Sequence, residues 1–162
     1  MCVSLPRPNW RNPIHLAAFG FGSGAPRRAP GTWGTLAALL PYLLLRELPL
    51  WGYLAVIVVA FVVGVYLCER TSRDLGVHDH GGIVWDEFVG LWITLILVPP
   101  GWGWLLLGFI LFRLFDILKP EPIGWADKQV SGGFGIMLDD VLAGLYAWLV
   151  LQGCYLGWQW WG

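Results

Sequence analysis

The sequence predicts an all-α fold, a polytopic membrane helical bundle of about five to six helices with an acidic cytoplasmic face. Hydrophobic residues make up 57% of the 162 residues and charged residues 13%, about half of the charged share typical of soluble domains. The 12 Trp, the 22 Gly and the mean hydropathy of +0.62 agree with this, because Trp settles at membrane interfaces and Gly is frequent in transmembrane helices. We expect a single domain over residues 1–162.

Charge-free intervals locate the helices, since a span needs about 20 residues at 1.5 Å each to cross a hydrocarbon core about 30 Å thick. Residues 48–68 and 141–162 are each long enough to cross once. Residues 88–112 are also uncharged, but Pro99-Pro100-Gly101 interrupts them and predicts a helical hairpin.

The remaining interval, residues 29–45, is strongly apolar only from Leu36 to Leu45. It predicts a helix that is short, tilted or partly re-entrant. The complete prediction is five helices, near 34–46, 50–68, 86–98, 102–118 and 140–161.

The charges indicate the orientation of this bundle. Five helices that start from a cytoplasmic N-terminus place nine of the ten basic residues on the cytoplasmic side and only Arg46 outside, as the positive-inside rule requires. The first 24 residues contain no apolar core of the length that a secretory signal needs. We therefore expect a multi-pass protein of the cytoplasmic membrane whose N-terminus faces the cytoplasm.

Charge and cysteine content exclude nucleic-acid binders, disulfide scaffolds and CxxC zinc proteins. The net charge of −1 provides no basic stripe for nucleic acid. Three Cys, at positions 2, 68 and 154, form neither a disulfide framework nor a CxxC zinc motif.

Acidic residues gather on the predicted cytoplasmic face. Residues 69–140 contain ten acids and five bases, a net charge of −5. Carboxylates that border apolar helices cost several kcal/mol each unless they are paired or bound to a cation. Oxygen ligands without a Cys or His cluster favour Mg²⁺ over zinc or copper.

Two adjacent acid pairs, Asp86-Glu87 and Asp139-Asp140, stand where apolar helices are predicted to begin. A carboxylate at such a place can cap free N–H groups, but one side chain suffices for each cap, so metal binding is favoured for the set. Gly90 and Gly144 each follow an acid by four residues. They would let the two helices approach closely and bring the carboxylates together.

Asp116 has two interpretations. Arg113 precedes it and Lys119 follows it by three residues, a spacing that predicts an ion-pair ladder on the helix surface. Its place at the end of a membrane helix equally fits an active site. The sequence likewise does not decide between a surface charge and a site role for Asp127.

Two further segments can carry chemistry. GFGSGAPRRAPGTWGT (20–35) combines flexible backbone N–H groups with Arg27, Arg28, Thr32 and Thr35 directly before a helix. It suits a phosphate or lipid headgroup, or a surface turn with basic anchors. The loop His78-Asp79-His80 could hold a metal, but its Gly-rich setting favours solvated side chains.

Three blocks of the chain resemble the bacterial phosphatidylglycerophosphatase A family. They are GSGAPRRAPGTWGT, IVWDEFVG and FRLFDILKPEPIGWADKQVSGGFGIMLDDVLAG, and they run in family order from about residue 22 to 144. The resemblance implies removal of the terminal phosphate from phosphatidylglycerophosphate, with Mg²⁺, at the cytoplasmic side of the bacterial inner membrane. The implied partner is a phospholipid of the cytoplasmic leaflet, and no oligomeric state is indicated.

The implied roles follow the acids and the Gly-rich turn. Mg²⁺ would be held by Asp86, Glu87, Asp139 and Asp140, together with Asp116. Lys119 would position the phosphate or pair with Asp116. A water molecule is the favoured nucleophile, since no Cys-x5-Arg loop exists. Phosphate binding is expected at Arg27, Arg28, Gly31, Thr32 and Thr35, and supporting roles at Asp127, His78, Asp79 and His80.

Two other functions compete with this one. A Mg²⁺-dependent CDP-alcohol phosphotransferase would need a run of Asp with DG and AR elements along two adjacent helices, which this chain lacks. A cation or proton transporter would need acids along a path through the membrane, whereas no predicted span carries a charge at mid-depth.

Overall fold

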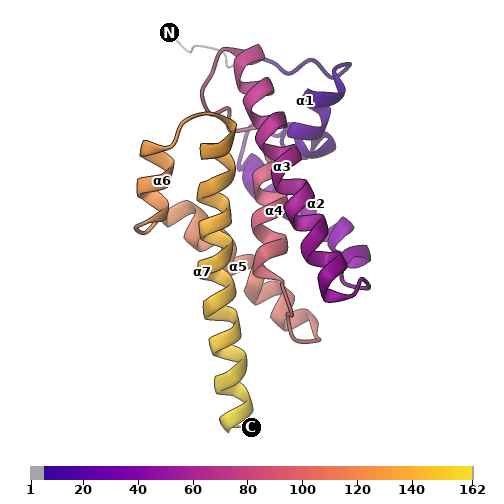
Figure 1. Cartoon of the computed structure of the whole chain (residues 1–162), viewed down its shortest axis with the longest axis vertical. Coiled ribbons are helices and arrows are strands. Elements are labelled where there is room, and N and C mark those ends of the chain that lie inside the picture. The colour runs from indigo at the N-terminus through magenta and orange to yellow at the C-terminus, as the bar shows by residue number, and fades with distance from the viewer. Residues whose placement is uncertain (1–5, 162) are drawn as a thin grey trace.

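A computed structural model describes residues 6–161. Within this range the chain is entirely helical (Figure 1), so the predicted all-α class is confirmed. The elements are α1 (Pro13–Ala18), the 3-10 helix η1 (Gly20–Gly22), α2 (Pro30–Leu45), α3 (Leu50–Leu75), α4 (Trp85–Thr94), α5 (Trp102–Leu118), α6 (Ile123–Gln129) and α7 (Gly132–Trp161).

The largest difference from the predicted helices concerns α7. This helix begins at Gly132 rather than near residue 140, because the glycines that suggest a loop serve close packing. A Cβ atom at Gly133 would overlap the carbonyl oxygen of Val65 in α3. Asp139 and Asp140 consequently lie two turns inside α7, and the prediction that they begin a helix is wrong.

Other helix ends also differ. α3 continues past residue 68 to Leu75, and its polar last turns carry Glu69 and Asp74 beyond the apolar stretch. α2 begins at Pro30, so Gly31 and Thr32 lie in its first turn. The short helices α1 and α6 have too few residues to produce a clear apolar period.

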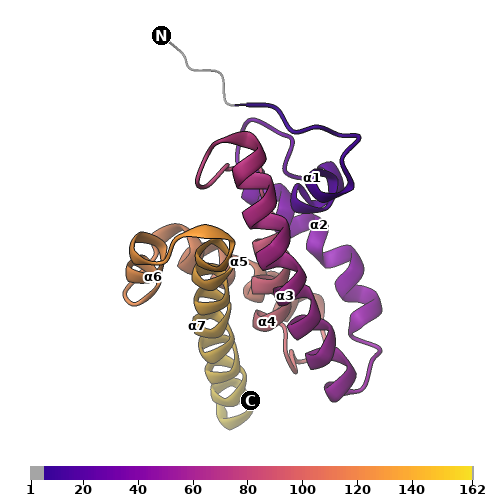
Figure 2. The ribbon, with the colours of Figure 1, turned by 45° about the horizontal axis from the view of Figure 1, so that its top comes forward.

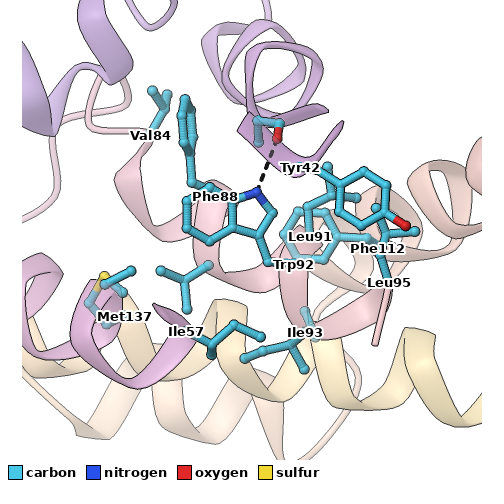
Figure 3. Packing of buried hydrophobic residues seen from close by; sticks show 14 of the residues in the cluster. Tyr42, Ile57, Val84, Phe88, Leu91, Trp92, Ile93, Leu95, Phe112 and Met137 are labelled. Carbon is cyan, nitrogen blue, oxygen red and sulfur yellow. Dashed lines mark hydrogen bonds between the residues drawn. The ribbon is translucent and has the colours of Figure 1, made fainter. Parts of the chain in front are cut away.

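α4 lies at the centre of the bundle. All of its residues from Glu87 to Thr94 are buried, between α7 on one side and α2, α3 and α5 around it. Phe88 and Trp92 project from α4 into the core (Figure 3). The Trp92 indole N–H donates a hydrogen bond of 3.0 Å to Ala38 O of α2, which satisfies its polar group. This packing fixes the position of the first turn of α4.

The two longest helices expose apolar side chains. α3 and α7 are long and apolar enough to cross a membrane. Val58, Val59 and Val62 on α3 are each more than 60% exposed, an arrangement that lipid would cover. α1 lies at the end of the bundle where α3 ends and α7 begins (Figure 2).

Candidate active site

Three carboxylates from two helices meet at the centre of the site. Asp86 and Glu87 occupy the first turn of α4, and Asp140 comes from α7. One carboxylate oxygen of each lies within 4.8 Å of the other two. The side chain of Asp139 lies beside this cluster and is also buried. The structure therefore brings together both acid pairs that the sequence singles out.

Two glycines produce this proximity. A Cβ atom at Gly144 of α7 would lie 2.5 Å from Gly90 O of α4, and one at Gly90 would lie 2.9 Å from Asp140 O. The backbones of α4 and α7 can approach this closely only without side chains at those positions. The close approach expected from Gly90 and Gly144 is present.

Four buried carboxylate oxygens in the cluster have no hydrogen-bond partner among the described residues. Each of the four side chains of the two acid pairs contributes one of these oxygens: Asp86 Oδ1, Glu87 Oε2, Asp139 Oδ1 and Asp140 Oδ2. Buried charges without partners are strongly unfavourable. A set made only of carboxylate oxygens is the donor set that a hard divalent cation such as Mg²⁺ prefers. These residues fit a magnesium ion.

Arg113 of α5 also contacts the cluster. Its Nη1 atom lies 3.6 Å from Glu87 Oε1 and forms a close ion pair with Asp116 Oδ2. The ladder interpretation of Asp116 is therefore correct for its contact with Arg113. The same contact places Asp116 next to the site, because Arg113 touches both Asp116 and Glu87.

Lys119 stands at the C-cap of α5 in the left-handed conformation, with φ of 44°. Its Nζ atom lies 2.5 Å from Asp127 Oδ1 of α6 and 2.7 Å from Asp139 Oδ2 of α7. The alternative pairing of Lys119 with Asp116 is thus wrong. Partial burial acts to lower the pKa of Lys119, but the hydrogen bonds to Asp127 and Asp139 outweigh it and raise the pKa above its usual value.

The predicted phosphate-binding residues divide into two groups: Gly31, Thr32 and Thr35 lie in α2, whereas Arg27 and Arg28 precede it. Gly31 lies at the site, where an added Cβ would overlap Glu87 Oε1 and lie 2.9 Å from Arg113 Nη1. Thr32 is half-buried in the same turn. Thr35 is buried, but its hydroxyl donates to Gly31 O at 2.8 Å, within its own helix. Arg27 and Arg28 are exposed, and neither forms an ion pair within residues 6–161.

The histidines of the His78-Asp79-His80 loop form hydrogen bonds with the backbone. His80 is buried, and its Nδ1 accepts a hydrogen bond of 3.1 Å from Gly82 N while its Nε2 lies 3.1 Å from Pro6 O. The solvated interpretation is therefore wrong for His80. His78 Nε2 accepts instead from Gly132 N at 3.2 Å. His78 and Asp79 line an open cavity of about 250 Å³ together with Asp86, Asp127 and Asp139.

Glu69 has a structural role that its local sequence does not reveal. Its carboxylate accepts a hydrogen bond of 2.6 Å from Gly133 N, in the first turn of α7, and pairs with Arg73. It thereby satisfies a free amide at the helix start. The two residues are 64 positions apart, so only the packing of α3 against α7 brings them together.

Comparison with known proteins identifies the family. The sequence model of the phosphatidylglycerophosphatase A family matches residues 16–155. The phosphatidylglycerophosphatase A of Escherichia coli K12 is 47% identical over 159 residues, which cover 98% of this chain and 91% of that protein. The Haemophilus influenzae protein of the same name is 54% identical over 142 residues, 86% of this chain and 87% of that protein.

A more distant relative and the solved structures complete the comparison. A protein of Bacteroides thetaiotaomicron with a provisional phosphatidylinositol-3-phosphatase name is 38% identical over 148 residues, 84% of this chain and 89% of that protein. No solved structure matches the chain. On the family match and the two relatives at 47% and 54% identity, the chain belongs to the phosphatidylglycerophosphatase A family.

Proposed function

We propose that this protein hydrolyses the terminal phosphate monoester of phosphatidylglycerophosphate and so completes phosphatidylglycerol. The observation that carries the proposal is the cluster of Asp86, Glu87 and Asp140, with their unpartnered oxygens, in a chain of this family. The names of the Escherichia coli and Haemophilus influenzae relatives support the substrate. Phosphate monoesters are among the slowest biological groups to hydrolyse unaided, which fits so costly a concentration of buried charge.

The proposed cofactor is Mg²⁺. Asp86, Glu87 and Asp140 would hold it. Asp139 and Asp116 lie beside the cluster and would supply further oxygen ligands. Bound there, Mg²⁺ would neutralise phosphoryl oxygens and make a nearby water molecule more acidic.

The basic residues organise the acids for this task. Lys119 engages Asp139 Oδ2 and leaves Oδ1 of the same carboxylate without a partner. Arg113 engages Glu87 Oε1 and leaves Oε2 without a partner. Each base therefore orients one carboxylate so that its second oxygen is available to a cation.

Water is the proposed nucleophile. In hydrolysis the water oxygen bonds to phosphorus, the P–O ester bond breaks, and the glycerol oxygen leaves with a proton. Within residues 6–161 neither cysteine is placed as a nucleophile, since Cys68 is buried with its Sγ 3.9 Å from Met137 Sδ, and Cys154 lies near the other end of α7.

The proposed location is the bacterial inner membrane, with α3 and α7 spanning it and the site on the cytoplasmic side. The apolar surfaces of these helices and the bacterial relatives support embedding. In this orientation the polar last turns of α3 and the Gly-rich start of α2 face the cytoplasm, and Arg46 and Glu47 face the opposite side.

The test is phosphate release by the detergent-purified protein, with Mg²⁺ and with EDTA. The substrates are phosphatidylglycerophosphate, phosphatidic acid, phosphatidylinositol 3-phosphate and a soluble phosphomonoester. We expect Mg²⁺-dependent release from phosphatidylglycerophosphate at a rate well above the others. Equal or faster release from phosphatidylinositol 3-phosphate would indicate that this lipid, which the name of the Bacteroides relative gives as substrate, is the substrate here. Release from none, with turnover of a CDP-lipid or cation flux into liposomes, would overturn the proposal.

A further inference from the structure

Arg113 is the basic side chain in direct contact with the Asp86, Glu87 and Asp140 cluster. It extends from α5, and only 15% of its side chain is exposed. The predicted phosphate-binding arginines, Arg27 and Arg28, are exposed and lie outside this contact. The local sequence predicts a contact of Arg113 with Asp116 along α5, whereas the contact of Arg113 with Glu87 joins α5 to α4.

The guanidinium group of Arg113 is only partly used. Both of its carboxylate contacts, to Glu87 and to Asp116, are made by the single nitrogen Nη1. Its Nε atom is buried and has no hydrogen-bond partner among the described residues. A guanidinium carries five donors in a planar fork that matches the oxygens of a carboxylate or a phosphate. The group therefore keeps donors for a second anion.

The first turn of α2 lies against the same group. A Cβ atom at Gly31 would lie 2.9 Å from Arg113 Nη1 and 3.0 Å from Nη2, and it would overlap Glu87 Oε1. Gly31 follows Pro30, which has no N–H, at the start of a 16-residue helix. By position the Gly31 amide has no acceptor within its helix, and it adds to the positive end of the helix dipole.

We propose that Arg113 and the Gly31 amide form the subsite that binds non-bridging oxygens of the substrate's phosphoryl group. The subsite rests on the proposed phosphatase function and specifies where that function holds its phosphate. Arg113 would be a catalytic residue, because it touches the phosphoryl group while it also holds Glu87. The absence of a side chain at Gly31 lets Glu87 Oε1 and the Arg113 guanidinium group lie directly against the first turn of α2.

The main experiment compares Arg113→Lys and Arg113→Gln with Arg46→Gln, a control at the far end of α2 whose one ion pair among the described residues is with Glu47. Each purified variant is measured for kcat, KM, the Mg²⁺ concentration for half-activation, and the inhibition constant of inorganic phosphate at saturating Mg²⁺. Arg113→Lys keeps the charge but loses the planar fork. We expect kcat/KM to fall about 10- to 100-fold and the phosphate inhibition constant to rise, with half-activation by Mg²⁺ within about twofold of wild type.

A purely structural role for Arg113 predicts a different result. If Arg113 only neutralises Glu87 and Asp116, the variants would shift the Mg²⁺ requirement and leave the phosphate inhibition constant unchanged. That outcome would overturn the proposal. Gly31→Ala tests the other half of the subsite by placing a Cβ against both the Arg113 guanidinium group and Glu87 Oε1, and we expect it to raise the phosphate inhibition constant in the same direction. Its failure to do so would remove Gly31 from the subsite.

A binding measurement separates this proposal from the proposed function and replaces kinetics where Arg113→Gln does not fold. Inorganic phosphate should raise the unfolding temperature of the Mg²⁺-loaded wild type and of Arg46→Gln, and it should have little effect on Arg113→Lys. This readout needs no turnover, so it holds even if phosphatidylglycerophosphate is not the substrate. An equal rise in wild type and Arg113→Lys would contradict the subsite.

Discussion

Lys119 Nζ lies 2.7 Å from Asp139 Oδ2 and joins the end of α5 to the second turn of α7. The same nitrogen holds Asp127 of α6 at 2.5 Å, so one ammonium group ties three helices together at the edge of the acidic cluster. Removing it would leave Asp139 and Asp127 without their common partner.

We expect Lys119→Gln to lower phosphatase activity by at least about tenfold, because an unpaired Asp139 side chain would no longer be held in place. Lys119→Arg should recover part of the loss, since it restores the charge with a different geometry. Activity assays at saturating Mg²⁺ check both expectations. Wild-type activity in Lys119→Gln would show that the ion pair does not orient Asp139.

The pH dependence of Lys119 follows from the sign of its shift. Because its pKa in the folded protein is raised above the usual value, the stability it contributes is fully present below its unfolded pKa and is lost only as pH rises through the folded one. At roughly pH 7 to 9, which is below both the usual pKa of a lysine and its raised value in the folded protein, Lys119 should stay charged. The decrease of kcat/KM at high pH, if one occurs in this range, should therefore lie at the same pH in wild type and in Lys119→Arg.

Asp140→Asn should separate the metal from the fold. In EDTA the variant should unfold at a temperature equal to or above that of wild type, since it removes one charge from a buried acidic cluster. Mg²⁺ at about 100 times its dissociation constant should raise the wild-type unfolding temperature by roughly 5–10 °C, and that of Asp140→Asn much less. Activity should fall by on the order of 100-fold or more. An equal Mg²⁺-dependent rise in both proteins would place the ion elsewhere.

The crossing of α4 and α7 can be tested with two glycines of the same helix. Gly144→Ala places a Cβ 2.5 Å from Gly90 O, whereas Gly153→Ala meets no atom within 4 Å. We expect Gly144→Ala to destabilise the protein by about 1–3 kcal/mol and to reduce activity, because it pushes the acid pairs apart. Gly153→Ala should be neutral or slightly stabilising. Unfolding midpoints and phosphate release measure the two effects, and equal behaviour would contradict a tight crossing.

The proposed orientation can be tested by labelling with a membrane-impermeant maleimide in a variant without native cysteines. Ser131→Cys, in the exposed turn before α7, should react only after the cells are lysed. Glu47→Cys, whose native side chain is 77% exposed between α2 and α3, should react in intact spheroplasts. The reverse labelling pattern would show that the bundle has the opposite orientation in the membrane.

The helices and the acid pairs could be predicted because their signals are local. Charge-free intervals mark the apolar helices, and adjacent acids next to spaced glycines mark the pairs that α4 and α7 bring together. The start of α7 could not be predicted in this way, since Gly132 and Gly133 suggest a loop until the backbone of α3 is packed against them. A glycine that allows close helix packing cannot be distinguished in the sequence from a glycine that allows a flexible loop.

The side chains whose partners are distant in sequence were the least predictable. Arg113 was expected to pair along its own helix, but its contact with Glu87 depends on how α5 packs beside α4. His80 was expected in solvent, and a backbone oxygen of Pro6 is its partner. Arg27 and Arg28 carried the expected phosphate contact because they are basic and close to glycines, which are properties of composition and not of position.

The depth of Asp140 within α7 has a consequence for how the enzyme would select its substrate. Asp140 lies eight positions after the first residue of α7, which places the acid about 12 Å along the helix at 1.5 Å per residue. In the proposed orientation the chemistry would occur near the level of lipid headgroups, so the substrate would react without being lifted out of its leaflet. A water-soluble phosphomonoester would have to descend to that level without an acyl chain to hold it there. Selection between lipid and soluble esters would then come from where the catalytic groups are placed, before any recognition of the glycerol headgroup.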